Sequence, residues 1–373
     1  MSGLNIGDLH VTVPIIQGGM GVGVSLAGLA AAVANQGGIG VISAVGIGLT
    51  EQERVKNLKL ANRVALEKHI VMAKQASSGS PGAIGVNIMM AVSDFDDLFE
   101  VAVQNRADVI IVGAGLFLKL PETVTFEMID EAGVKLIPKV SSAKAARLIF
   151  EYWLNHYGRT PDAVILEGPL AGGHLGFKKD DIVNENYSLE NLLVATVAEV
   201  RKFEEILGKE IPVIAGGGIY TGEDMYKIMQ LGAKGVKMGS RFVTTTECDA
   251  AIELKNYYLN ATEDDTMIIQ SPVGLPGRVI KNKFVEDILA GETKPVNCPW
   301  KCLKTCNYQK VPYCIAVALY NAAIGNLDEG FVFSGSKGPK ATKITSVSET
   351  IHEIIAEYNQ LETEGNKIAL PHL

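Results

Sequence analysis

Apolar runs rich in Val and Ile alternate with amphipathic stretches along the first two thirds of the chain. The stretches, such as "SLAGLAAAVANQGG" and "GEDMYKIMQLGA", have the spacing of helices with one apolar face. Near-continuous apolar strands that alternate with helices are typical of a parallel sheet covered on both faces. The predicted strands are residues 13–17, 40–43, 84–89, 108–113, 135–140, 163–167, 212–215 and 235–239.

Eight strand–helix units are the number that closes a (β/α)8 barrel, and residues 1–245 match the usual size of that fold. A doubly wound open sheet is the alternative, but it normally has fewer strands and a glycine-rich first turn with an acidic partner. We therefore predict an α/β fold, a TIM barrel with a mostly helical C-terminal insertion. Residues 246–345 would form a helical substrate-side subdomain, helical from about 283 to 326, and residues 346–373 a C-terminal helix and tail.

Composition and charge narrow the function classes. Hydrophobic residues make up 47% of the chain and charged residues 20%, which is typical of a globular protein. The net charge of −8 and the absence of a basic stripe argue against nucleic acid as a partner. No apolar run has the length of a membrane span, and "MSGLNIGDLH" lacks the regions of a signal peptide. We expect a cytoplasmic protein without a membrane partner.

Glycines follow several of the predicted strands. In a TIM barrel the active site lies at this end, where the strands end and the loops to the helices begin. The seventh strand ends in Gly216, Gly217 and Gly218, and the eighth is followed by Gly239 and Ser240. Glycines before a helix start let backbone N–H groups approach an anion, and these two loops commonly hold a phosphate in barrel enzymes. The alternative is that the glycines only form tight turns.

A histidine, His174, lies in "EGPLAGGHLG", a short loop after the sixth predicted strand. An imidazole there can take or give a proton near neutral pH, or hold a substrate oxygen. The alternative is a histidine that is hydrogen-bonded within a loop. No HExxH pairing is present, so the sequence does not support a zinc hydrolase.

Five motifs occur in order at the predicted strand ends: "PIIQGGM", "GVNIMM", "LAGGHLG", "PVIAGGGI" and "MGSRF". Together they resemble the nitronate monooxygenase family, formerly called 2-nitropropane dioxygenase, which includes FMN-dependent enoyl-acyl-carrier-protein reductases. The resemblance runs from about residue 10 to about residue 285, with a weaker echo in "GFVFSGS". It implies a (β/α)8 barrel that holds non-covalent FMN across its mouth.

The resemblance also implies a role for each matching residue. Gly18, Gly19 and Met20 would lie along the flavin, and Asn87 beside its ring. Lys139 would lie near the N1–O2 edge of the flavin, where a cation stabilises the anionic reduced form.

Two further residues of the resemblance lie in the loop after the sixth strand. Gly173 would contact the cofactor, and His174 would face the substrate over the flavin as the catalytic residue. The phosphate would be bound by Gly216, Gly217, Gly218, Gly239 and Ser240.

The resemblance implies an FMN-dependent oxidoreductase. Its substrate would be a small molecule, an alkyl nitronate, which it would oxidise with O2 to a carbonyl compound and nitrite. An NAD(P)H-dependent reductase of an enoyl thioester or quinone, with His174 as proton donor, stays open. Against it, "SPVGLPGRVIKNKF" lacks the histidine that we expect in the corresponding loop of the enoyl reductases. A third alternative is a flavin-free barrel that binds a phosphorylated metabolite. A homodimer is an open arrangement for all three.

The C-terminal third contains a group of cysteines: Cys298, Cys302, Cys306 and Cys314. In a reducing compartment such crowding does not indicate disulfides. The spacing of four predicts that the first three lie along one side of a helix. We favour reduced cysteines that pack a helical subdomain; zinc or an iron–sulfur cluster is the alternative, although the spacing matches no common pattern of either. Lys301 and Lys304 would lower the pKa of exposed thiols.

Overall fold

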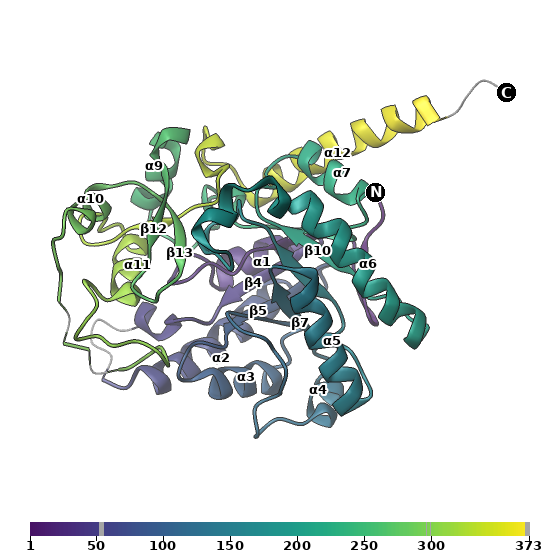
Figure 1. Ribbon diagram of the computed structural model, residues 1–373, viewed down its shortest axis with the longest axis horizontal. Helices are drawn as coiled ribbons and strands as arrows, with labels where there is room; N and C mark the ends of the chain where they lie inside the picture. Colours follow the sequence, from purple (N-terminus) through teal and green to yellow (C-terminus); the bar gives the residue numbers. More distant parts are fainter. Residues whose placement is uncertain (52–55, 296, 299, 370–373) are drawn as a thin grey trace.

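Eight parallel strands close into a barrel in the structure, a computed structural model that describes residues 1–51, 56–295, 297, 298 and 300–369 (Figure 1). Each strand pairs in parallel with its neighbours, and the last returns to the first to complete the ring. The predicted TIM barrel is confirmed. Its strands are β3 (Ile15–Gln17), β4 (Ile39–Ser43), β5 (Ala83–Met89), β6 (Val109–Gly113), β7 (Lys135–Val140), β8 (Val164–Glu167), β10 (Val213–Gly216) and β11 (Gly235–Met238).

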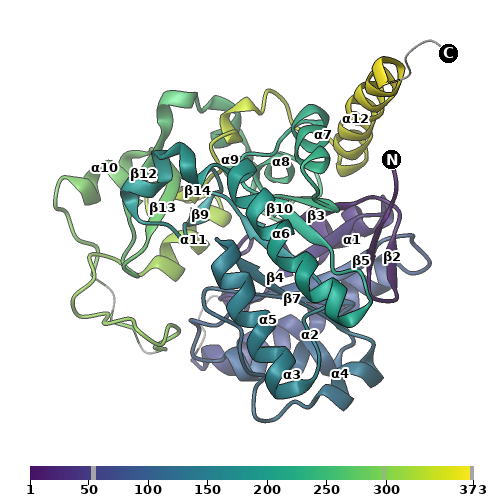
Figure 2. The same ribbon diagram turned by 45° about the vertical axis from the view of Figure 1, so that its right-hand side comes forward.

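Helices follow the strands and surround the barrel; α5 and α6 lie side by side in Figure 2. Local sequence sets their ends. At the helix starts, the hydroxyl groups of Ser142 and Thr221 accept hydrogen bonds from backbone N–H groups in the first turns of α5 and α7. At the helix ends, Gly158 and Gly208 follow α5 and α6 in the left-handed conformation. These helices are α1 (Ala27–Asn35), α2 (Leu58–Ala76), α3 (Phe95–Gln104), α4 (Phe126–Ala132), α5 (Ala143–Tyr157), α6 (Leu189–Leu207), α7 (Gly222–Gln230) and the short α8 (Ser240–Val243).

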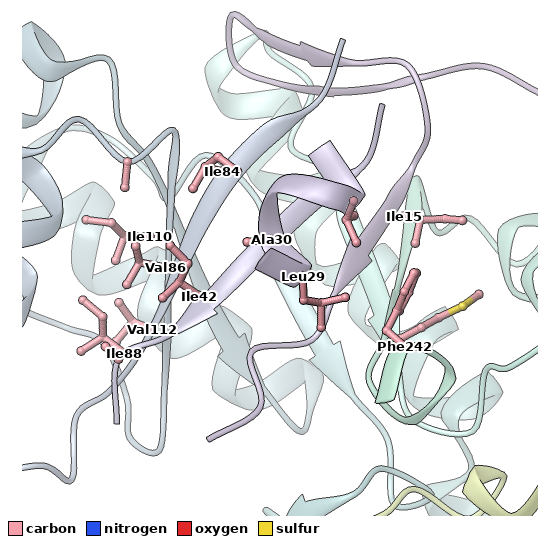
Figure 3. Close-up of a cluster of buried hydrophobic side chains, with 14 of the residues drawn as sticks. Ile15, Leu29, Ala30, Ile42, Ile84, Val86, Ile88, Ile110, Val112 and Phe242 are labelled. Atoms are coloured by element: carbon pink, nitrogen blue, oxygen red, sulfur yellow. The ribbon is translucent and has the colours of Figure 1, made fainter. Parts of the chain in front are cut away.

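The side chains of the strands alternate between two apolar cores. Ile15, Ile42 and Val86 face outward and pack with α1 residues such as Leu29, as Figure 3 shows. Inward-facing neighbours such as Ile16 fill the barrel itself. This alternation explains why the strands read as continuous apolar runs, since both faces of each strand are buried.

An N-terminal hairpin, β1 (Leu4–Ile6) with β2 (Leu9–Val11), was not predicted. Its buried side chains Leu4, Ile6 and Val11 belong to the same cluster as the inward-facing residues of the barrel strands. The hairpin, which precedes the first barrel strand, therefore completes the apolar core inside the barrel.

The C-terminal part contains a sheet as well as helices. A four-stranded antiparallel sheet is formed by β9 (Gly173–His174), β12 (Thr266–Gln270), β13 (Pro276–Ile280) and β14 (Val332–Phe333). Strand β9 comes from the barrel loop after β8, so this sheet joins the C-terminal part to the barrel mouth. The helices are α9 (Ile252–Asn260), α10 (Lys283–Leu289), α11 (Ile315–Ala323) and α12 (Val347–Ala369), of which α12 packs against α7.

The predicted helix from about 283 to 326 is wrong. Among the described residues of this stretch, α10 and α11 are the only α-helices, and the described cysteines before α11 lie outside any helix. Gly291, Pro295 and Pro312 interrupt the stretch, and Pro cannot continue a helix because it lacks the N–H donor. Within the described residues, no helix is long and apolar enough to span a membrane.

Candidate active site

A cavity of about 760 Å³ opens at the carboxyl ends of the barrel strands and extends under the C-terminal sheet. Residues at or just after the carboxyl end of every barrel strand contribute to it, as expected for a TIM barrel. All of the site residues named from the sequence line this one cavity: Gly18, Gly19, Met20, Asn87, Lys139, Gly173, His174, Gly216, Gly217, Gly218, Gly239 and Ser240.

His174 is held between the barrel and the C-terminal sheet. Its strand β9 pairs with β13, and its Nε2 lies 2.7 Å from Oγ of Ser271. The ring of Phe333 packs edge-on against the imidazole, with ring centroids 5.0 Å apart. Burial, together with the positive charge of Lys139, lowers the pKa of His174 to about 4. The imidazole is therefore neutral at pH 7, with Nε2 engaged by Ser271.

Two lysines share one carboxylate on the floor of the cavity. Nζ of Lys139 lies 2.8 Å from Oε2 of Glu167, and Nζ of Lys237 lies 3.7 Å from Oε1. Burial raises the pKa of Glu167, but the two ammonium groups outweigh it and hold that pKa below its ordinary value. Burial lowers the pKa of Lys237 to about 8 despite the opposing charge of Glu167. With all three groups ionised the array has a net charge of +1.

The glycines after β3 are required by the protein itself. A Cβ atom on Gly19 would lie 2.5 Å from Cβ of Asn87, and one on Gly18 would lie 3.2 Å from Cα of Gly239. The ends of β3, β5 and β11 thus approach closely, so a side chain at Gly19 would displace Asn87 and one at Gly18 would crowd Gly239. Tight packing explains these two glycines without a ligand.

The loops after β10 and β11 form a different kind of glycine site. Gly217 and Gly218 have φ values of 100° and 83°, which side chains rarely adopt. Gly239 has an ordinary φ of −101°, and a Cβ there would meet only the Met20 side chain, at 3.6 Å and beyond. Space is therefore left open above Gly239, at the start of α8. The backbone N–H of Gly335 donates to Oγ of Ser240 at 2.8 Å and adds the "GFVFSGS" segment to this end of the cavity.

A sequence profile of the nitronate monooxygenase family matches residues 5–357, which is almost the whole chain. The chain belongs to this family.

The chain is similar to proteins that have several different names. A probable nitronate monooxygenase of Staphylococcus aureus strain JH9 is 25% identical, over 95% of this chain and 96% of that protein. A (3aS,4S,5R,7aS)-5-hydroxy-7a-methyl-1-oxo-octahydro-1H-indene-4-carboxyl-CoA dehydrogenase of Mycobacterium tuberculosis is 30% identical over 278 residues, and the chain covers 66% of that protein's length. Among solved structures, FabK from Thermotoga maritima superimposes with a TM-score of 0.72 at 26% identity, covering 96% of each chain.

The cavity of this nitronate monooxygenase family member has features at both ends that fit FMN. The open space at Gly239 offers backbone and hydroxyl donors at one end. At the other end, the net positive array of Lys139 and Lys237 suits the electron-rich edge of a reduced flavin. The hydroxyl of Ser43 lines the same cavity, is buried, and has no hydrogen-bond partner among the described residues. These donors and charges fit the phosphate and the electron-rich ring edge of FMN.

Sequence reasoning missed several residues of the site. Ser271 and Phe333 contact His174 from the C-terminal sheet, and a linear motif does not reveal such contacts. Lys237 was detectable, because a charged residue inside the apolar run before "MGSR" is unusual in a strand buried on both faces.

The cysteines lie beside this cavity rather than on a helix, and Cys302 lines it. Burial raises the pKa of the Cys302 thiol to about 12, and it also raises the pKa values of Cys306 and Cys314. The lowering by Lys301 and Lys304 was expected for exposed thiols, and none of these three cysteines is exposed; desolvation by burial is the largest effect on their pKa values. They are poor nucleophiles as free thiols.

Proposed function

We propose that the chain binds FMN non-covalently across the barrel mouth and oxidises alkyl nitronates with O2 to a carbonyl compound and nitrite. The observation that carries this proposal is the neutral imidazole of His174, held by Ser271 at the top of a cavity whose floor has a positive charge. Membership of the nitronate monooxygenase family supports the class of reaction.

The loops after β10 and β11 would hold the phosphate of FMN. Gly217, Gly218 and Gly239 allow close approach of the backbone, and Ser240 adds a hydroxyl. Lys139 would lie at the N1–O2 edge, where its charge favours the reduced cofactor. When bound, FMN supplies the redox chemistry by accepting electrons from the substrate and passing them to O2.

His174 would bind and orient the substrate. The described residues give Nδ1 no hydrogen-bond partner, whereas Nε2 is engaged by Ser271. With Ser271 donating to Nε2, Nδ1 carries the proton and can donate to an anionic nitronate oxygen. A nitronate is already deprotonated, so the site needs no strong base, and this agrees with a pKa of about 4.

A second candidate function is reduction of an enoyl thioester or quinone by NAD(P)H. The observation in its favour is the apolar wall that Leu275, Leu319 and Phe333 add to the cavity, since this wall suits an acyl chain. Against it, an imidazole with a pKa of about 4 is almost wholly unprotonated at pH 7 and is a poor source of the proton that must reach carbon.

Anaerobic reduction of the purified protein separates these functions. A nitronate and NAD(P)H are added in parallel, and the flavin absorbance is followed. Bleaching by the nitronate supports the proposed function; bleaching by NAD(P)H alone supports the reductase. A protein that stays colourless after purification with FMN supplied would favour the flavin-free barrel that binds a phosphorylated metabolite. A cytoplasmic location and a homodimer stay predictions.

A further inference from the structure

Four cysteines that the proposed function does not use surround one small cavity beside the large one. Its lining includes Cys298, Cys302, Cys306 and Cys314, together with Lys301. All four are free thiols. The thiols of Cys302, Cys306 and Cys314 each interact electrostatically with other thiols of the group. Taken together, these interactions include every pair among the four cysteines.

The segment from Cys298 to Cys314 is fixed to the barrel although its described residues form no helix. The backbone N–H of Ser93 donates to the carbonyl oxygen of Cys302 at 2.9 Å, and that of Lys304 donates to Ala91 at 2.9 Å. Between α10 and α11, the described residues form only isolated bridges. A stretch of this length without regular structure is unusual inside a compact domain, and a bound metal centre can replace the apolar core that such a stretch lacks.

The arrangement of the thiols distinguishes between kinds of metal centre. Among the described residues, no group of three or more His, Cys, Asp or Glu side chains is placed to hold a metal ion. The four thiols instead surround a space. A single zinc ion needs four sulfur atoms about 2.3 Å from one centre, whereas an iron–sulfur cluster is held at its corners by thiolates spaced around several atoms.

The surroundings also suit a negatively charged cluster. Lys301 lines the cavity and supplies a positive charge. Cys314 is the N-cap residue of α11, so its side chain lies at the positive end of the helix dipole. Hydrogen bonds from N–H groups to cysteine sulfur are among the features that stabilise protein-bound clusters.

We propose that Cys298, Cys302, Cys306 and Cys314 bind an iron–sulfur cluster in this cavity. The spacing of the cysteines in the sequence does not indicate such a site; the shared cavity does. Cys302, Leu303 and Ile315 line both this cavity and the large one, so the cluster would form part of the wall of the cofactor site.

The test is elemental analysis of the full chain, expressed with added iron and purified without oxygen. We expect iron and acid-labile sulfide in equal amounts, about two or about four of each per chain. Reduction with dithionite should give a low-temperature electron paramagnetic resonance signal distinct from that of a flavin radical. A protein without iron and sulfide after reconstitution, or one with zinc and no sulfide, would overturn the proposal.

Cysteine variants locate the site. Cys306→Ser and the double variant Cys302→Ser/Cys306→Ser should lose most of the iron and sulfide. Cys248→Ser is the matched control, because Cys248 is a free, buried cysteine whose thiol contacts the carbonyl oxygen of Val24, away from the group. Equal iron in all variants would show adventitious binding and refute the assignment. FMN content is measured in the same samples, so failure of the cluster and failure of the flavin proposal are told apart.

Discussion

Nε2 of His174 lies 2.7 Å from Oγ of Ser271, although the two residues are 97 positions apart in the chain. His174 comes from the barrel loop after β8, and Ser271 from the turn between β12 and β13. That turn is itself fixed, because the backbone N–H of Ser271 donates to the carbonyl oxygen of Leu275 at 3.0 Å. The C-terminal sheet thus sets the orientation of the imidazole at the barrel mouth.

Ser271→Ala removes this contact and leaves the ring of His174 free to turn. We expect kcat/KM for a nitronate to fall about tenfold, the effect of losing one orienting hydrogen bond. Ser271→Thr keeps the hydroxyl and should retain most of the activity. Because Ser271 acts through His174, the acid limb of the pH profile should shift in Ser271→Ala, and an unchanged profile would indicate a structural role alone.

His174→Gln tests the substrate-binding group directly. We expect kcat/KM to fall by about 10² or more, while FMN content and the visible spectrum stay as in the wild type. His156→Gln is the control, since His156 is exposed on α5. Wild-type turnover in the His174 variant would remove the catalytic assignment.

Lys139→Met removes the positive charge nearest to Glu167 on the cavity floor. The anionic reduced flavin then loses stabilisation, so the midpoint potential should become more negative by about 30 mV for each tenfold loss of relative affinity. Lys237→Met should shift the potential in the same direction, because it also lowers the net charge of the array from +1 to 0. Lys234→Met is the control, since its partner Glu210 is on the surface. A spectroelectrochemical titration that gives equal potentials for all three would contradict this role.

Gly239→Ala tests the phosphate end of the cavity. The backbone of Gly239 is unstrained, and a methyl group there would meet only Met20 in the protein, so folding should be unaffected. The methyl group would occupy the space proposed for the phosphate, and we expect the Kd for FMN to rise at least about tenfold. Gly208→Ala is the control. Gly208 has a φ of 63° at the end of α6 and does not line the cavity, so the variant should lose stability without a change in FMN affinity. Unchanged FMN binding in Gly239→Ala would exclude this loop.

The barrel could be predicted from the sequence because its signal is local. Runs such as the one ending at Gly216 are apolar throughout and recur with helices between them, and motif glycines mark the strand ends. The C-terminal sheet could not be predicted in the same way, because β9 and β14 have two residues each and exist only through pairing with β13. The cysteine spacing gave a wrong helix for a related reason. A spacing of four is compatible with a helix but does not require one, and the described cysteines before α11 lie outside any helix.

The low pKa of His174 makes stability depend on pH. Its folded pKa of about 4 lies below the ordinary value of 6.5, so between these values the unfolded chain binds more protons than the folded one. The free energy of unfolding of the FMN-free protein should therefore fall as pH drops from 6.5 towards 4, with a contribution from His174 of about 1–3 kcal/mol. His69, whose pKa is also lowered by burial, adds to the fall in the wild type. The contribution of His174 is isolated by urea unfolding of the wild type and His174→Asn at pH 7 and pH 4.5. The variant should lose less stability over this interval, and parallel losses would show that the imidazole of His174 titrates normally.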